Sequence, residues 1–153
     1  DRHAGRGLYD LSSAAAVATD EAEGGIGRLR NLAGELPEAL NTYLKLVGEA
    51  GADRYPGSPL IAAKLLRPQD RLVAIEKHPE EADLLAATLA PFRKARMETA
   101  DGYARLNKLL PPPERRGLIL IDPPFEAPDE FQILAQAVRD AFRRFATGIY
   151  LVW

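Results

Sequence analysis

Residues 117–125, Gly-Leu-Ile-Leu-Ile-Asp-Pro-Pro-Phe, combine the side chains in this sequence that are best suited to chemistry. The carboxylate of Asp122 and the carbonyl of Pro123 offer two hydrogen-bond acceptors on a stiff backbone, because each proline fixes φ and lacks an N–H. Such a pair suits an exocyclic amino group, which has two hydrogens to donate. The ring of Phe125 suits the face of a flat heterocycle, where stacking contributes ~1–3 kcal/mol. These residue types predict a site for a planar group that carries an amino nitrogen.

A purely structural interpretation of residues 122–125 is equally open. Prolines end a strand, Asp is a common capping residue and Phe is a common core residue. The four apolar residues before Asp122 do not alternate with polar ones, which is typical of a strand buried on both faces in a parallel sheet. Open α/β sheets bind ligands at the carboxyl ends of their strands, so we expect Asp122 and Phe125 at such an end.

Length and composition fit one domain with a real core. The 153 residues are 46% hydrophobic, and 20 basic against 22 acidic residues give a net charge of -2. Any contact with nucleic acid must therefore be local. The absence of cysteine excludes disulfides, thiolate nucleophiles and cysteine-based zinc sites, and it is compatible with a reducing cytoplasm. No apolar run approaches ~18 residues, so we expect no membrane span, and we expect no signal peptide.

The elements that must position residues 122–125 alternate along the chain. Apolar runs predict strands at 71–75, 95–100, 117–121 and 149–153. Helices are predicted at 59–67, from 79 onward, at 103–110 and at 129–145. The buried face of the helix from 79 is expected to contain Leu84, Leu85, Ala86 and Leu89. That of the last helix is expected to contain Phe131, Leu134, Ala135, Val138, Phe142 and Phe145.

Residues 10–54 carry no strand signal and are longer than an ordinary crossover. Pro37 at a first turn, followed by apolar residues at helical spacing, predicts a helix that contains Leu40, Tyr43, Leu44 and Val47. A second helix is expected over residues 20–36. We interpret residues 10–54 as a helical insertion that forms a small lobe for the substrate.

Four polar residues stand where a strand or loop meets the next helix. Glu76 follows the strand at 71–75, where Rossmann-type folds bind ribose hydroxyls, although the dipole of the next helix would also favour a carboxylate there. Asp101 is placed to cap a helix or to accept a hydrogen bond from a ligand, and the two roles are compatible. Ser58 is a good N-cap and is also well placed to meet a ligand. We interpret His78 as a structural cap or turn residue.

The two ends of the sequence do not read as the ends of a fold. Residues 1–7, Asp-Arg-His-Ala-Gly-Arg-Gly, look like a loop that should follow a strand, and their glycines suit a tight turn near a ligand or a plain surface loop. Residues 149–153 form an apolar strand without a polar tail. We therefore expect an internal piece of a longer protein. Basic clusters at 93–96, 115–116 and 143–144 are either solvated faces or phosphate contacts.

Several blocks of sequence together resemble one family. Residues 122–125 alone look like the (Asn/Asp/Ser)-Pro-Pro-(Tyr/Phe/Trp) motif that amino-methyltransferases use on adenine. In order, the blocks are residues 1–7, 55–62, 76–79, 100–102, 115–125 and 144–150. Together they resemble the large-subunit (23S) ribosomal RNA (adenine-N6)-methyltransferase J family, formerly labelled as involved in catabolism of external DNA. The likeness spans nearly the whole chain and is least distinctive over residues 10–54.

The resemblance implies an α/β fold of the Rossmann-like class I S-adenosylmethionine-dependent methyltransferases. Residues 1–153 would be a partial methyltransferase domain with a parallel-sheet core and the helical insertion at 10–54. The family's first strand lies between strands two and four, and it is missing here. We therefore expect a gap in the sheet, with unpaired backbone groups on both neighbours. The resemblance further implies a cytoplasmic monomer that acts on adenine in ribosomal RNA and needs neither a membrane nor a metal.

Matching motifs imply roles for individual residues. The contacts to S-adenosylmethionine would be made by His3, Gly5, Ser58, Glu76, Asp101 and Gly102. Asp122 would be the catalytic acceptor, and Pro123, Pro124 and Phe125 would bind the substrate. Phe125 stands where the family usually has Tyr, so stacking is retained and a hydroxyl is lost. Two alternatives stay open: an amino-methyltransferase acting on DNA adenine or protein glutamine, and a non-catalytic nucleic-acid-binding or DNA-utilisation accessory protein.

Overall fold

The computed structural model describes residues 3–13, 23–32, 34–125 and 127–153, and within these residues the strands pair two by two. The pairs are antiparallel β1 (Leu8–Asp10) with β2 (Arg54–Pro56), parallel β3 (Leu72–Glu76) with β4 (Ala95–Thr99), and parallel β5 (Leu118–Ile121) with β6 (Ile149–Val152). The helices that alternate with the parallel strands are α4 (Ser58–Leu65), α5 (Pro79–Leu89), α6 (Gly102–Leu109) and α7 (Glu130–Arg144). The predicted α/β order of parallel strands and helices is confirmed.

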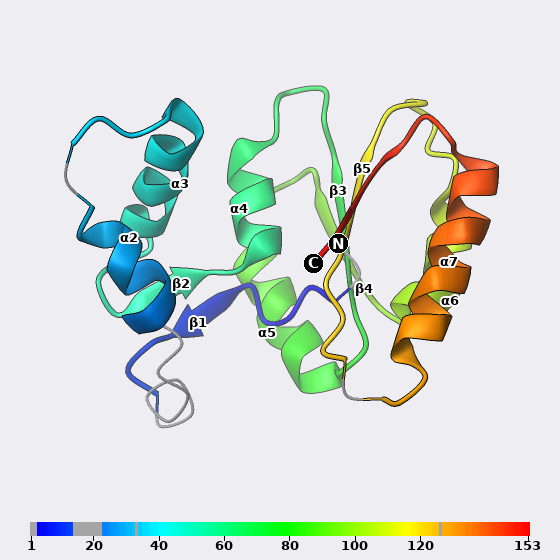
Figure 1. Cartoon of the computed structure of the whole chain (residues 1–153), viewed down its shortest axis with the longest axis horizontal. Helices are drawn as coiled ribbons and strands as arrows, with labels where there is room; N and C mark the ends of the chain where they lie inside the picture. The colour runs from blue at the N-terminus through cyan, green and yellow to red at the C-terminus, as the bar shows by residue number, and fades with distance from the viewer. Residues whose placement is uncertain (1–2, 14–22, 33, 126) are drawn as a thin grey trace.

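The parallel strands lie in the middle of the molecule, with helices on two sides. Helices α4 and α5 lie on the side of β3 and β4, and α6 and α7 lie on the side of β5 and β6 (Figure 1). A separate lobe at one end holds β1, β2, the π-helical turn η1 (Glu23–Gly27), α2 (Arg28–Arg30) and α3 (Glu38–Glu49). No helix in the described residues is long and apolar enough to cross a membrane.

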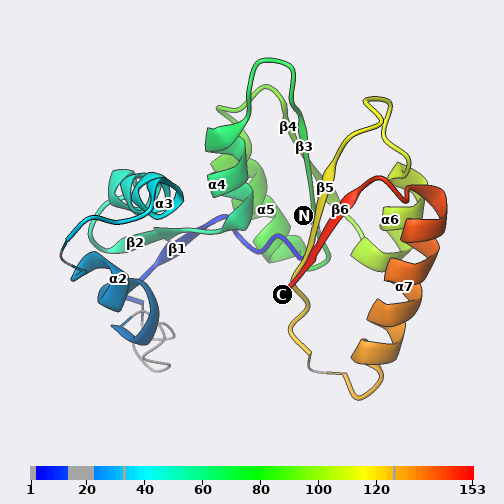
Figure 2. The ribbon, with the colours of Figure 1, turned by 45° about the horizontal axis from the view of Figure 1, so that its top comes forward.

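Strands β3 and β5 lie near each other but belong to different sheets (Figure 1 and Figure 2). Each pairs with one strand in the described part of the chain: Glu76 lies opposite Thr99, and Ile121 lies opposite Val152. The expected gap between these two strands is therefore present. The edge of β3 on this side is partly satisfied by the start of the chain, since the carbonyl of Ile75 accepts the N–H of Ala4 over 3.1 Å.

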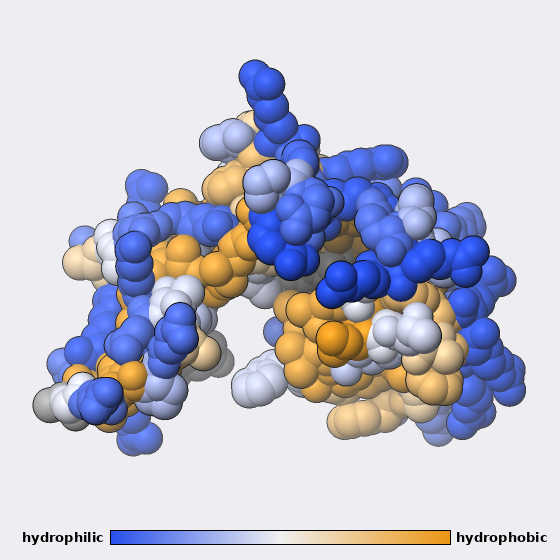
Figure 3. Space-filling view, turned by 90° about the horizontal axis from the view of Figure 1, so that it is seen from above, coloured by the Kyte–Doolittle hydropathy of each residue, from blue (hydrophilic) through white to orange (hydrophobic). Residues whose placement is uncertain are grey.

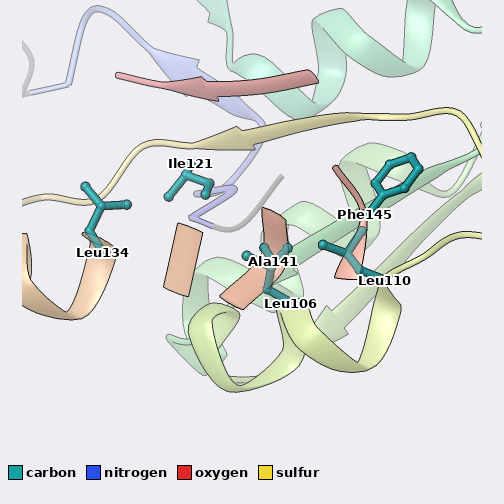
Figure 4. Close-up of a cluster of buried hydrophobic side chains, with 6 residues drawn as sticks. All are labelled: Leu106, Leu110, Ile121, Leu134, Ala141 and Phe145. Atoms are coloured by element: carbon teal, nitrogen blue, oxygen red, sulfur yellow. The ribbon is translucent and has the colours of Figure 1, made fainter. Parts of the chain in front are cut away.

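Two apolar clusters hold the helices against the strands. One joins α6, β5 and α7 through Leu106, Leu110, Ile121, Leu134, Ala141 and Phe145, whose side chains share one interior space (Figure 4). The other joins the start of the chain to β3, α4 and α5 through Ala4, Ala63, Ala74, Leu85 and Leu89. Burying a large aliphatic side chain contributes roughly 1.5–3 kcal/mol, so these clusters carry much of the stability.

The predicted buried face of α7 is partly wrong. Phe131 and Phe142 are 67% and 54% exposed, and Ala135 is also exposed. The buried residues of α7 are Leu134, Ala137 and Ala141, and Phe145 is buried just after the helix. Helix α5 shows the same kind of error, since Leu84 and Ala86 are exposed while Ala82 is buried. Only the residues of each helix that face its neighbours are covered, by α6 and β5 for α7 and by β3 and β4 for α5, so the remaining apolar residues stay exposed.

Strand β5 is not buried on both faces as predicted. Ile121 is fully buried, but Leu118 is 64% exposed. Within the described residues the strand pairs with β6 alone, and the apolar residues Ile149, Leu151 and Val152 of β6 are exposed as well. The described residues thus leave apolar surface of this sheet open to water, and the space-filling view shows a broad hydrophobic area (Figure 3).

The insertion at 10–54 differs from its prediction at two points. Strands β1 and β2 begin and end it, although no strand was predicted there. The helix after Pro37 is confirmed as α3. The helix expected over 20–36 is reduced in the described residues to η1 and α2; residues 14–22 and 33 lie outside the description.

The N-cap of α4 also differs from its prediction. Gly57, not Ser58, holds this position, because Gly57 is extended and donates its N–H to the carbonyl of Gly7 over 2.8 Å.

Candidate active-site cleft

The glycine-rich loop of residues 3–7 lies along the carboxyl end of β3. The N–H of Ala4 donates to the carbonyl of Ile75 over 3.1 Å, and the Nε–H of Arg6 donates to Glu81 on α5 over 2.9 Å. Gly7 has φ +79°, and a Cβ there would lie 2.9 Å from Leu85 Cδ1. The tight turn therefore requires glycine at this position.

Glu76 fixes this loop to the end of β3. Its side chain is 4% exposed, and its carboxylate accepts three backbone N–H groups: Gly5 over 2.9 Å, and Lys77 and His78 over 2.8 Å each. A carboxylate has roughly four acceptor positions, so one remains after these three bonds. The side chain is thus held in one orientation and keeps one acceptor for a ligand.

Residues that are far apart in the sequence line one cleft. Its volume is about 340 Å³, and it is lined by His3, Gly5, Glu76, His78, Glu81, Asp122, Pro123 and Pro124. A cleft of this size lies at the lower end of the range for small-molecule sites, ~300–1,000 Å³. The structure therefore brings six of the predicted site residues together at the ends of β3 and β5.

Two residues of this cleft were not predicted as site residues. His78 is the N-cap residue of α5, as its structural interpretation required, and its side chain makes no capping hydrogen bond. Glu81 pairs with Arg6, and the guanidinium holds the pKa of Glu81 below its ordinary value. Because His78 lies two residues after Glu76, the sequence could have placed it at the site. The Arg6–Glu81 pair could not be predicted in this way, because it joins segments that are 75 residues apart.

Asp122 follows β5 and forms part of the cleft wall. Asp122 is exposed by its surface area, but partial loss of hydration at its carboxyl disfavours the charged form and raises its pKa. A raised pKa at a cleft carboxylate is typical of functional sites, although buried structural acids show it too.

The aromatic residue of the motif lies beside the cleft rather than among its lining residues. Phe125 has φ +54° and is 37% exposed. Its ring stacks on the ring of Phe131, with centroids 4.5 Å apart and planes 25° from parallel. One face of the Phe125 ring is therefore covered by a second ring.

Three predicted cofactor residues, Ser58, Asp101 and Gly102, are not among the lining residues. Asp101 is the N-cap of α6 and accepts the N–H of Ala104 over 3.0 Å, which confirms its capping role. The N–H of Ala100 donates to the carbonyl of Glu76 over 3.0 Å, so the end of β4 adjoins the cleft. Asp101 and Gly102 therefore follow a strand end next to Glu76.

Tyr103 connects the two sides of the cleft, and the sequence patterns did not single it out. The ring of His3 meets the ring of Tyr103 edge-on at 5.9 Å. The hydroxyl of Tyr103 donates to Glu130 at the start of α7 over 3.1 Å. The glycine-loop side is thus linked through Tyr103 to the helix that carries Phe131.

Fold and site together define an α/β protein with a cleft at the carboxyl ends of parallel strands. A family model described as "Ribosomal RNA large subunit methyltransferase D, RlmJ" matches residues 1–153. The chain belongs to this family, which confirms the resemblance seen in the sequence blocks.

Named relatives and a solved structure agree with this assignment. The chain is 45% identical over 157 residues to the ribosomal RNA large subunit methyltransferase J of Escherichia coli (strain K12) and 40% identical over 158 residues to that of Haemophilus influenzae. All of this chain is covered, but only 56% of each relative. A crystal structure of a Legionella pneumophila protein superposes with a TM-score of 0.88 at 37% identity, covering 99% of this chain and 57% of that one.

Proposed function

We propose that this chain carries the methyl-transfer site of an enzyme that methylates N6 of an adenine in large-subunit ribosomal RNA. The observation that carries this proposal is the meeting of Glu76 and Asp122, at the ends of β3 and β5, in one cleft with the glycine loop. The proposed fold is the Rossmann-like class I type, with residues 1–153 as part of a methyltransferase domain and residues 10–54 as its helical insertion. Both named relatives are ribosomal RNA methyltransferases.

The polar groups on one side of the cleft fit S-adenosylmethionine. The remaining acceptor position of Glu76 suits a ribose hydroxyl, and Gly5, whose N–H holds the Glu76 carboxylate, lines the same cleft. His3 lines the same side. Ser58, Asp101 and Gly102 are proposed as further contacts from the family resemblance and from the position of the end of β4. When bound, this cofactor supplies a methyl group on a positively charged sulfur.

The other side of the cleft suits the adenine amino group. The amino nitrogen is a poor nucleophile because its lone pair is delocalised into the ring. Asp122 and the carbonyl of Pro123 accept its two hydrogens and draw the nitrogen toward a tetrahedral shape. The lone pair then points into the cleft, and a separation of ~3–3.5 Å between the reacting atoms supplies much of the acceleration. Phe125 and Pro124 hold the base after it leaves its stack.

Asp122 also provides a destination for a proton. As the N–C bond forms, the bond between the methyl carbon and sulfur would break and its electron pair would stay on sulfur, which leaves the positive charge and one proton to release on the amino nitrogen. The Asp122 carboxylate is already hydrogen-bonded to that nitrogen in this arrangement, and partial loss of hydration raises the pKa of its carboxyl. Its Oδ therefore accepts the proton and passes it to water.

Substitution of Asp122 tests the proposal. Asp122→Ala in the complete encoded protein is expected to abolish transfer of a radiolabelled methyl group to ribosomal RNA while calorimetric binding of S-adenosylmethionine is retained. Retained turnover would refute the role of Asp122. Transfer to duplex DNA or to protein glutamine in preference to RNA would favour the alternative amino-methyltransferases, and no binding of S-adenosylmethionine by the unaltered protein would favour an accessory role.

A further inference from the structure

Phe131 is a large apolar side chain in an unexpected place. It lies in the first turn of α7 and is 67% exposed, although its position in the apolar repeat predicted burial. Its ring is stacked on Phe125, directly after the Asp122–Pro124 corner. Phe142, on the same helix, is 54% exposed but meets Tyr150 at 6.4 Å instead. The ring of Phe131 therefore packs against Phe125 of the motif and is not part of the buried core.

Phe125 needs support from its surroundings. Its φ of +54° is rarely adopted by residues with a Cβ, because the side chain crowds the following carbonyl. A residue in such a conformation keeps it only when neighbouring structure holds it there. The ring of Phe131 is the stacking partner of Phe125 within the described residues.

Phe131 is itself firmly placed. The N–H groups of Gln132 and Ile133 both donate to the carbonyl of Asp129 over 3.0 Å, which starts α7 with regular geometry. Glu130 accepts the Tyr103 hydroxyl, and Leu134, one turn later, is buried in the core. The ring of Phe131 is therefore presented by a fixed helix end.

We infer that Phe131 is a positioning residue of the acceptor side: it covers one face of Phe125 and so presents the opposite face to the acceptor adenine. This inference rests on the proposed function, in which Phe125 stacks on the base. A ring that is already held in its binding orientation loses less conformational freedom when the base arrives. We expect Phe131 to affect substrate binding more than folding stability. Its ring is 67% exposed and so buries little apolar surface.

The test uses steady-state methyl transfer by the complete encoded protein, with a large-subunit ribosomal RNA transcript and radiolabelled S-adenosylmethionine. Phe131→Leu removes the ring but keeps an apolar side chain, and Phe131→Tyr keeps the ring. Phe142→Leu is the matched control on the same helix. We expect Phe131→Leu to raise KM for RNA three- to tenfold, with kcat within twofold and KM for the cofactor unchanged. Phe131→Tyr and Phe142→Leu are expected to stay within twofold of the unaltered protein.

A double-mutant cycle separates positioning from direct contact with RNA. If Phe131 acts through Phe125, Phe131→Leu has no further effect on KM in a Phe125→Ala background. A further rise in KM in that background would show that Phe131 binds RNA itself and would overturn the inference.

The remaining outcomes separate this inference from the proposed function. An unchanged KM in Phe131→Leu, or an equal rise in Phe142→Leu, would overturn the inference alone. If the unaltered protein transfers no methyl group to RNA, the proposed function fails, and the acceptor-side role of Phe131 fails with it.

Discussion

The carboxylate of Glu76 accepts the backbone N–H of Gly5 over 2.9 Å, although 71 residues separate the two in sequence. The same carboxylate accepts the N–H groups of Lys77 and His78, so one buried side chain organises both the loop and the end of β3. The cofactor side of the proposed site therefore depends on the charge and the acceptor count of Glu76. This relationship leads directly to the first prediction.

Glu76→Gln is expected to destabilise the fold and to weaken cofactor binding. The amide NH₂ replaces one acceptor oxygen with a donor, so at least one backbone N–H meets another N–H group. An unsatisfied buried donor costs about 1–3 kcal/mol. We expect a loss of this size in the free energy of unfolding, measured in urea. Glu80→Gln, an exposed neighbour in the first turn of α5, is the control and should change this free energy by less than about 0.5 kcal/mol. Equal effects of the two substitutions would contradict the assigned role of Glu76.

The pH dependence of methyl transfer is expected to report on Asp122. Only the ionised carboxylate can accept the hydrogen bond of the adenine amino group and then accept the proton that the nitrogen releases. Partial loss of hydration raises the pKa of Asp122 above its ordinary value of 3.8, so kcat should fall as pH drops through that raised pKa and should level off above it. Asn at this position keeps one acceptor oxygen and does not titrate.

Asp122→Asn should therefore lower kcat and remove the acid limb of the profile. The measurement is kcat at saturating RNA and cofactor over the acidic range in which the protein stays folded. An acid limb that persists unchanged in Asp122→Asn would assign it to another group and contradict the prediction.

Two glycine substitutions are expected to have opposite effects on stability. In Gly7→Ala the new Cβ meets Leu85 at 2.9 Å and Thr88 Cγ2 at 3.1 Å, and φ is +79°, so we expect a loss of about 1–3 kcal/mol. Gly48 lies in the last turn of α3 with open space around its Cβ position, so Gly48→Ala should gain up to about 0.5 kcal/mol from helix propensity.

Chemical denaturation of both variants, compared with the unaltered protein, measures these differences. Loss of stability in Gly48→Ala would show that α3 is not packed as described. An unchanged stability in Gly7→Ala would show the same for the loop of residues 3–7.

Local sequence signals determined the order of the four parallel strands and of the helices between them, and several of their ends, but not β1 and β2. Pro37 and Pro79 mark the starts of α3 and α5, and Asp101 caps α6, because these effects involve only neighbouring backbone groups. The strand-end position of Asp122 was also readable, since two prolines end β5 wherever it packs. These features depend on a few consecutive residues, and the sequence contains all of them.

Tertiary structure alone decided which side chains are covered and which groups meet. Periodicity marks an apolar stripe on α7, but the packing of α7 on α6 leaves Phe131 outside the core and against Phe125. Likewise, the third hydrogen bond of Glu76 and the cleft shared with Asp122 arise from contacts between segments about 45 to 120 residues apart. Burial and long-range hydrogen bonds are properties of pairs of surfaces, and a residue's own neighbours in sequence do not specify its partner.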